Sequence, residues 1–282
     1  MSVHIMIDSA ANVSENVSKR LITIPMTVSF GDEEYIDGVT IDHRGFYEKL
    51  EQSNVLPVTS QISPARYEEY FRDIAEKGDT AVMLTLSSKF SGTYQSAMIA
   101  AEEFKGTIFV VDTLAVTLSI GILAEYALRL VDAGMDAANI AREMEKQRDR
   151  VCLVAVLDTL EYLKKGGRVS KTLAIAGALL NIKPVISVEN SEIRILDKAR
   201  GTKMGNKMLT QNIQKIGDAD MDMPILFGYT GLTDTLLQSY LTDSAEKWES
   251  LEKPLPVSGV GSIIGTHAGP GAYAVAFFKK NI

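Results

Sequence analysis

The stretch Leu84-Thr-Leu-Ser-Ser-Lys-Phe-Ser-Gly-Thr-Tyr-Gln-Ser-Ala97 decides how the chain around it folds. It continues an apolar run, Thr80–Leu86, that is typical of a β-strand, and it leads into a helical pattern from Ala97 to Phe104. The polar turn between them gathers hydroxyls and backbone N–H groups around one small space, where the helix dipole favours negative charge. The stretch therefore predicts an α/β unit with an anion-binding turn.

A second hydroxyl cluster, Thr59-Ser-Gln-Ile-Ser-Pro64, lies one helix upstream. By itself it is best explained as a helix cap, because Ser63 followed by Pro64 is a common helix start. The later turn, Ser87–Ser96, has more hydroxyls than a cap requires. We expect the two turns to lie at neighbouring strand ends and to form one anion pocket, which is the predicted functional centre.

The first half of the chain alternates strands with helices, which indicates a mainly parallel sheet covered by helices on both faces. Asp8 and Asp112 end two of the strands, where each either caps the loop or orients hydrogen-bond donors. The expected strands are Val3–Ile7, Leu21–Phe30, Thr80–Leu86 and Thr107–Val111.

The second half contains a predicted antiparallel hairpin, Lys183–Val188 with Glu192–Leu196. Longer helical patterns follow, and the glycine-rich stretch from Gly261 to Gly271 predicts a loop. These features favour a two-layer domain with a mixed sheet and helices on one side. We therefore predict an N-terminal α/β domain over residues 1–150 and a C-terminal α/β domain over residues 151–282.

The composition narrows the classes of function. The chain has 282 residues, of which 46% are hydrophobic and 23% charged, so it can bury a large core. Its net charge of −7 argues against general affinity for nucleic acid. Asp8 interrupts the first apolar run and no run approaches the length of a membrane span, so we expect a soluble, cytoplasmic protein. The spacing of histidines and of Cys152 does not suit a metal site.

Enzyme motifs give little support to catalysis. The chain has neither a Gly-x-Ser-x-Gly elbow nor a Gly-Lys-Ser/Thr phosphate loop, and His4, His43 and His267 show no triad order. A serine-dependent acyl hydrolase or transferase using Ser91 and His267 remains the alternative to a binding protein. A regulatory sensor of a small carboxylate is a third interpretation.

Positive charge is concentrated in two short segments of this acidic chain, Lys164-Lys-Gly-Gly-Arg168 and Arg200-Gly-Thr-Lys203. These two basic segments could simply be a solvent-exposed turn and a helix start that have no binding function. A local anionic partner or the mouth of an anionic ligand site explains them as well.

Five ordered motifs are spread over nearly the whole chain: Thr59-Ser-Gln-Ile-Ser-Pro64, Ser87-Ser-Lys-Phe-Ser-Gly-Thr-Tyr-Gln-Ser-Ala97, Leu163-Lys-Lys-Gly-Gly-Arg-Val169, Ile182-Lys-Pro184 and Gly265-Thr-His-Ala-Gly-Pro-Gly271. Together they resemble the motifs of the DegV family. Its members are bacterial fatty-acid-binding proteins that include the acyl-binding subunits of fatty acid kinase. Ile62 stands where the family usually has proline, and Phe90 where leucine is common; these changes would alter the pocket lining but not the hydroxyls.

The resemblance implies that a long-chain, palmitate-like fatty acid lies between and within the two domains, without another cofactor or a metal. It implies a non-catalytic protein that presents the carboxylate to a separate fatty acid kinase for phosphorylation. Thr59 and Ser91 would bind the carboxylate. The implied supporting head-group residues are Ser60, Gly92, Thr93 and His267, and the implied entrance or kinase-facing residues are Arg168, Arg200 and Lys203.

Physical chemistry is consistent with this assignment. Burying about fourteen methylenes gains roughly 11 kcal/mol before ordering costs, so the tail supplies the affinity. Uncharged hydroxyls suit a carboxylate that must later react, since a buried arginine would hold it more tightly. The apolar segments Leu173–Leu180 and Ile213–Ile216 are expected to line a tunnel or to belong to the core.

Overall fold

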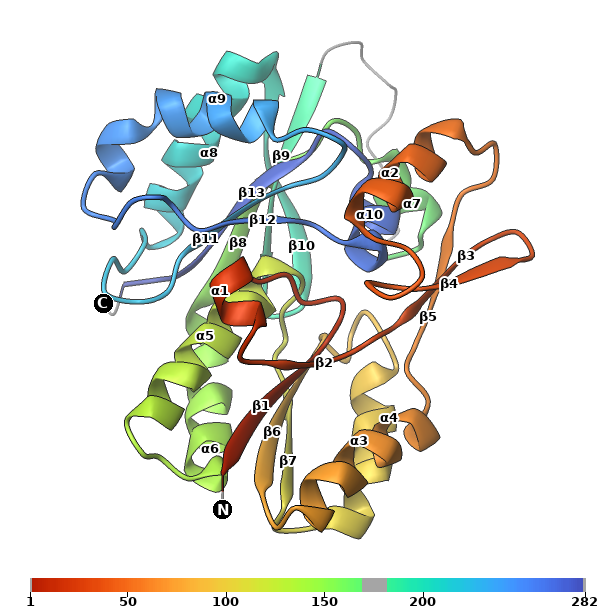
Figure 1. Ribbon diagram of the computed structural model, residues 1–282. Coiled ribbons are helices and arrows are strands. Elements are labelled where there is room, and N and C mark those ends of the chain that lie inside the picture. Colours follow the sequence, from red (N-terminus) through yellow and green to blue (C-terminus); the bar gives the residue numbers. More distant parts are fainter. Residues whose placement is uncertain (1, 169–181, 281–282) are drawn as a thin grey trace.

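The computed structural model describes residues 2–168 and 182–280, which form two large sheets and one small sheet (Figure 1). The first large sheet is built from the N-terminal half and the second from the C-terminal half, with the small sheet beside them. The predicted Leu173–Leu180 helix lies outside the described residues.

The N-terminal sheet has the order β2-β1-β6-β7, and all its neighbours are parallel. Helices α3 and α4 lie on one side of it, and α5 and α6 on the other (Figure 1). The predicted parallel α/β/α architecture is thereby confirmed. Its elements are β1 (Val3–Asp8), β2 (Ile22–Ile24), β6 (Thr80–Thr85), β7 (Ile108–Asp112), α3 (Pro64–Glu76), α4 (Thr93–Ala101), α5 (Leu118–Asp132) and α6 (Ala137–Gln147).

The predicted strand Leu21–Phe30 is wrong as a single element, because the structure divides it at Pro25. Proline has no N–H for a strand ladder, so the chain leaves β2 there and starts a different sheet. This small antiparallel sheet has the order β4-β3-β5. Its strands are β3 (Thr27–Phe30), β4 (Glu33–Ile36) and β5 (Val58–Ser60), and helix α2 (His43–Gln52) precedes β5.

The C-terminal sheet is mixed and has six strands, in the order β10-β9-β8-β13-β11-β12. Helices α8 and α9 pack on one of its faces, which confirms the predicted layer arrangement. The predicted β9–β10 hairpin is confirmed as antiparallel. The elements are β8 (Val151–Val156), β9 (Ile182–Glu189), β10 (Glu192–Arg200), β11 (Leu226–Tyr229), β12 (Val257–Gly259), β13 (Tyr273–Phe278), α8 (Thr202–Ile216) and α9 (Thr235–Asp243).

The glycine-rich stretch near the C-terminus contains a helix, α10 (Ser262–Ala268), where the sequence predicted a loop. Asp37 accepts hydrogen bonds from the Ser262 hydroxyl at 2.6 Å and from its backbone N–H at 3.3 Å. This carboxylate satisfies donors at the start of the helix, a partner that is distant in sequence. The short α7 (Glu161–Lys165) packs against α10.

The two halves share one buried apolar cluster, which joins residues such as Ile5 of β1 to Ile186 of β9. The division near Arg150 remains a prediction, although β8 starts at Val151 and opens the second sheet. Among the described residues, no helix is long and apolar enough to cross a membrane. The same residues contain no group of three His, Cys, Asp or Glu side chains that could hold a metal ion.

Candidate ligand-binding site

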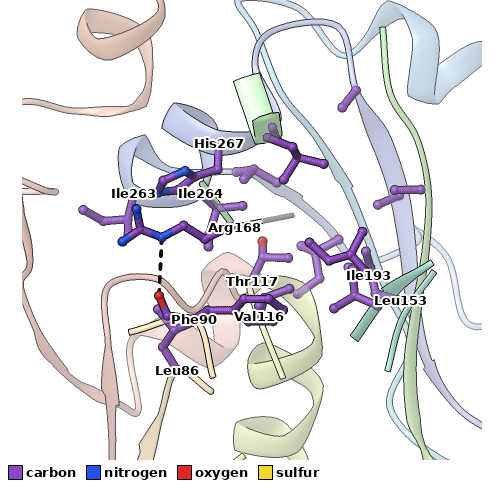
Figure 2. A pocket seen from close by; sticks show the side chains of 18 of the residues that line it. Leu86, Phe90, Val116, Thr117, Leu153, Arg168, Ile193, Ile263, Ile264 and His267 are labelled. Carbon is purple, nitrogen blue, oxygen red and sulfur yellow. Dashed lines mark hydrogen bonds between the residues drawn. The ribbon is translucent and has the colours of Figure 1, made fainter. Parts of the chain in front are cut away.

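A cavity of about 510 Å³ lies between the two large sheets and the small sheet. This volume is in the range of sites that enclose small-molecule ligands. Figure 2 shows its lining, with Arg168, His267 and Phe90 toward one side and Ile193 and Leu153 toward the other.

One face of the C-terminal sheet forms the apolar wall of the cavity. Because side chains alternate along a strand, Leu153 and Ala155 face the cavity, while Cys152 and Val154 point to the opposite face of the sheet. There they belong to a separate buried apolar cluster under α8 and α9, the second core. Ile213 also belongs to that second core and does not line the cavity, so of the two expectations for Ile213–Ile216 the structure has the core for this residue. The other cavity-facing residues of this sheet include Ile186, Val188, Ile193, Ala272 and Ala274.

Helices α5 and α10 close the apolar part of the cavity. Val116 and Leu118 line it at the start of α5, and Ile263 and Ile264 line it from α10 (Figure 2). The lining of the cavity is therefore mainly apolar, and Thr117, Thr230 and Tyr273 add hydroxyl-bearing side chains to it.

The predicted head-group residues meet at one end of this cavity. Thr59 lies within β5, Ser91 lies in the loop before α4, and His267 lies on α10; all three line the cavity. The Oγ1 atom of Thr59 is 3.3 Å from Nε2 of His267. The expectation of two turns at neighbouring strand ends is wrong, because β5 belongs to the small antiparallel sheet and not to the parallel one.

Ser91 is held by its own loop. Its Oγ lies 2.9 Å from the Thr93 hydroxyl and accepts a hydrogen bond from the Thr93 backbone N–H at 3.2 Å. Thr93 is buried and lies behind Ser91, whereas Ser60 and Gly92 line the cavity. The loop therefore orients Ser91 through its hydrogen bonds with Thr93, the first residue of α4.

Gln61 links the two hydroxyl segments, and sequence reasoning did not assign it a role. Its Nε2 donates to Ser96 Oγ on α4 at 3.2 Å. A Cβ added to Gly92 would lie 2.0 Å from the Gln61 amide oxygen, so only glycine leaves room for this bridge. The signal was in the sequence, because Gln61 and Gly92 belong to the two quoted motifs.

The acidic strand ends organise the loop that carries Ser91. Asp8 accepts a hydrogen bond from the Leu86 backbone N–H at 2.6 Å, and Asp112 accepts one from the Ser88 backbone N–H at 3.1 Å. Asp8 is fully buried, and burial raises its pKa to about 7 despite the two backbone donors that oppose this shift. Both carboxylates thus orient backbone donors next to the loop that carries Ser91.

His267 is packed under the end of α7. A Cβ on Gly166 would lie 2.2 Å from the His267 Nδ1 atom, so glycine at this position allows the close approach. Burial, with a smaller contribution from the Arg168 charge, lowers the pKa of His267 to about 4. Near neutral pH its imidazole is therefore uncharged and can exchange a hydrogen bond with Thr59.

The predicted basic residues separate into two places. Arg168 is exposed and lines the cavity, and its Nη1 donates to the Gly166 carbonyl at 2.7 Å. Its Nε also donates to the Phe90 carbonyl at 3.4 Å, as Figure 2 shows. Arg200 ends β10 and Lys203 lies in the first turn of α8, and neither lines the cavity.

The arrangement gives no support to the hydrolase alternative. In the described part of the chain, no hydrogen bond joins Ser91 to His267, and no carboxylate bonds to the His267 ring. A serine nucleophile requires a base within hydrogen-bonding reach, and that base is usually oriented by a third group.

Comparison with known proteins places the chain in a family. It matches the profile of a family described as "Uncharacterised protein, DegV family" over residues 2–280. A DegV domain-containing protein of Caldanaerobacter subterraneus subsp. tengcongensis is 33% identical over 283 residues, which cover 99% of each chain.

Solved structures give the same result. A DegV family protein from Thermus thermophilus, described for its fatty acid binding, is 28% identical with a TM-score of 0.88, and the match covers 99% of this chain and 100% of that one. The Streptococcus pneumoniae fatty acid kinase (Fak) B3 protein, loaded with linoleic acid, is 21% identical with a TM-score of 0.85 over the same coverage. The latter likeness concerns the fold.

The fold and the cavity thus define an α/β protein with an amphipathic pocket between its sheets. The chain belongs to the DegV family. The resemblance of the five sequence motifs is confirmed.

Proposed function

We propose that the protein binds one long-chain fatty acid non-covalently, with the tail in the cavity and the carboxylate at its polar end. The observation that carries this proposal is that one cavity combines a mainly apolar lining with the hydroxyls of Thr59 and Ser91 and the imidazole of His267. An amphipathic ligand of the same shape satisfies both parts, whereas a small polar metabolite would leave the apolar wall unfilled.

Thr59 and Ser91 are the proposed ligands of the carboxylate. Each carries a hydroxyl that can turn its proton toward an anion, and His267 lies against Thr59 at 3.3 Å. Hydrogen bonds to a charged group each contribute about 1.5–3 kcal/mol. Three further residues are proposed to support this site. Thr93 contacts the Ser91 hydroxyl, and Ser60 and Gly92 contribute as the backbone neighbours of Thr59 and Ser91.

The features of the site favour a protein that holds the carboxylate for another enzyme over one that carries out a reaction on it. No buried arginine or lysine lies among the described lining residues, and the Arg168 side chain is exposed at the polar end. A carboxylate held by neutral groups stays available to a phosphate donor. We propose that a separate fatty acid kinase in the cytoplasm is the partner, and the name of the Streptococcus pneumoniae relative supports this choice.

Native mass spectrometry of the purified protein tests the proposal. We expect the mass of one long-chain fatty acid added to the chain under native conditions and lost on denaturation. An acyl adduct that survives denaturation and maps to Ser91 would instead establish the serine acyltransferase or hydrolase. Protein that takes up neither palmitate nor oleate when offered both would contradict the binding function.

A further inference from the structure

The turn of the β9–β10 hairpin touches the loop that carries Ser91, although the two segments lie far apart in the sequence. The Oγ atoms of Ser87 and Ser191 are 2.6 Å apart. Ser191 also donates from its backbone N–H to the Leu114 carbonyl, at 2.9 Å. Figure 1 shows the hairpin reaching down between the two sheets toward the loops that follow β6 and β7.

Ser87 connects this contact to Ser91. Ser87 is fully buried, and its carbonyl accepts hydrogen bonds from the backbone N–H groups of Phe90 at 3.0 Å and Ser91 at 3.2 Å. Its hydroxyl accepts from the Lys89 N–H at 3.2 Å, and its own N–H donates to the Ala115 carbonyl at 3.0 Å. The position of Ser91 therefore depends on where Ser87 is held.

The hydroxyl pair has one proton arrangement that satisfies every partner. Ser87 donates to Ser191, and Ser191 donates to the Leu114 carbonyl at 3.3 Å, while Ser87 accepts from the Lys89 N–H. Removing the Ser191 hydroxyl leaves the buried Ser87 hydroxyl without this acceptor, which weakens the anchoring of the loop.

On both sides of the contact, residues other than glycine have positive φ angles, in the left-handed region of backbone conformation. The φ angles are 52° at Leu114, 48° at Asn190 and 62° at Ser191. Such conformations persist where the surrounding structure holds them, and here the hydrogen bonds between the two loops do so.

The same hairpin also forms part of the tail wall. Ile186 and Val188 of β9 and Ile193 of β10 line the cavity. In Figure 2, Ile193 lies across the cavity from Arg168 and His267. One rigid hairpin thus contacts the apolar end of the cavity through its strands and the head-group loop through its turn.

We propose that Ser191 is a positioning residue for the carboxylate-binding loop, and that the β9–β10 hairpin couples packing of the acyl tail to placement of the head group. The proposal rests on the fatty-acid site proposed above. Ser191 acts through Ser87 and does not itself touch the ligand.

The test compares the affinity for palmitate with that for hexadecanol in the parent protein and in Ser191→Gly. Glycine adopts the positive φ without cost, so this variant removes the hydroxyl without adding backbone strain. Loss of one neutral hydrogen bond predicts about fivefold weaker palmitate binding. The affinity for hexadecanol should change less, so the ratio of the palmitate affinity to the hexadecanol affinity should be smaller in the variant than in the parent.

Ser187→Ala is the matched control. Ser187 is buried in the same hairpin, it does not line the cavity, and its hydroxyl has no hydrogen-bond partner within the described residues. This variant should keep the parent's preference for the acid. Combining Ser191→Gly with Ser91→Ala should cost less than the sum of the two single changes, since both act on one hydroxyl position.

The coupling to the tail is tested by shortening both ligands. In the parent, the preference for acid over alcohol should fall when ten-carbon ligands replace sixteen-carbon ones, because the shorter chain leaves Ile193 uncovered. In Ser191→Gly the preference should depend little on length.

The outcomes separate this inference from the proposed function. A parent protein that binds neither palmitate nor hexadecanol contradicts the fatty-acid site itself. A parent that prefers the acid, combined with a Ser191→Gly variant that keeps the full preference at equal thermal stability, overturns the role of Ser191 and leaves the function standing. A preference that is independent of chain length in the parent overturns the coupling.

Discussion

The two ends of the cavity are built in different ways. The apolar wall comes largely from one face of one sheet, where residues two apart on β8, such as Leu153 and Ala155, point the same way. The polar end is assembled from a small-sheet strand, a loop and a helix that carry Thr59, Ser91 and His267. The apolar wall consists of many similar side chains on a regular strand pattern, whereas the polar end depends on a few individual hydrogen bonds.

This difference predicts how each end responds to change. Burial energy is spread over many contacts, so it scales with ligand length and tolerates individual substitutions. A hydrogen-bonded site loses a whole interaction when one atom is removed. We therefore expect the affinity to depend mainly on the length of the ligand's tail, and the preference for an acid over an alcohol to depend on the residues at the polar end.

The largest effect is expected from shortening the ligand. Replacing palmitate by decanoate removes six methylenes, which corresponds to about 5 kcal/mol, or roughly three orders of magnitude in Kd. Displacement of a fluorescent fatty acid measures both constants. If decanoate binds within tenfold of palmitate, the apolar wall does not supply the affinity.

A second prediction concerns the pH dependence of folding. Folding lowers the pKa of His267 from 6.5 to about 4, so between these values the unfolded chain binds a proton that the folded chain does not. His267 should therefore reduce stability as the pH falls from 6.5 to 4, by up to about 3 kcal/mol.

Asp8 acts in the opposite direction over this range, because folding raises its pKa from 3.8 to about 7. The informative quantity is thus the difference between the parent and His267→Gln, measured by urea unfolding at several pH values without ligand. The parent should lose stability relative to the variant on acidification. Parallel curves from pH 7 to 4 would show that His267 is not held neutral by the fold.

The polar end is tested by removing its two hydroxyls. Ser91→Ala and Thr59→Val should each weaken palmitate binding by roughly one to two orders of magnitude. The double variant should lose less than the sum, because both side chains serve one carboxylate. The difference between palmitate and hexadecanol should narrow in each variant, and an unchanged difference in Ser91→Ala would place the head group elsewhere.

The smallest effects on binding are expected at the basic residues. Arg200→Glu and Lys203→Glu should leave palmitate affinity within about twofold, since neither side chain lines the cavity. Arg168→Gln should weaken it by a few-fold at low salt and less at high salt, because an exposed cation is screened.

The same three variants test the kinase partner. Acyl-phosphate formation with a fatty acid kinase catalytic subunit should fall more than palmitate binding does, because removing or reversing a positive charge at the rim slows encounter with the partner. Equal losses in binding and phosphorylation would restrict these residues to the ligand site.

Much of the fold followed from the sequence. The strand–turn–helix at Thr80–Phe104 and the hairpin in the second half have local signals, namely period-two or apolar runs bounded by turn residues, and the structure has both. The division of Leu21–Phe30 at Pro25 was also readable in principle, because proline interrupts a strand ladder.

Other elements depended on partners that are distant in sequence. Helix α10 is short and lies in a glycine-rich stretch, and its start is held by Asp37, which directly follows β4. Local propensity favours a loop there, and only the tertiary contact changes the outcome.

The sequence by itself determined which chemical groups are present at the site: the hydroxyls of Thr59 and Ser91, the imidazole of His267 and the alternating apolar strands. Tertiary structure decided that these groups share one cavity, that His267 is neutral, that Gln61 bridges the two hydroxyl segments, and that Arg168 lies at the cavity while Arg200 does not. The physical reason is that composition and periodicity act within a segment. Burial, hydrogen-bond partners and pKa depend on segments that meet only when the chain is folded.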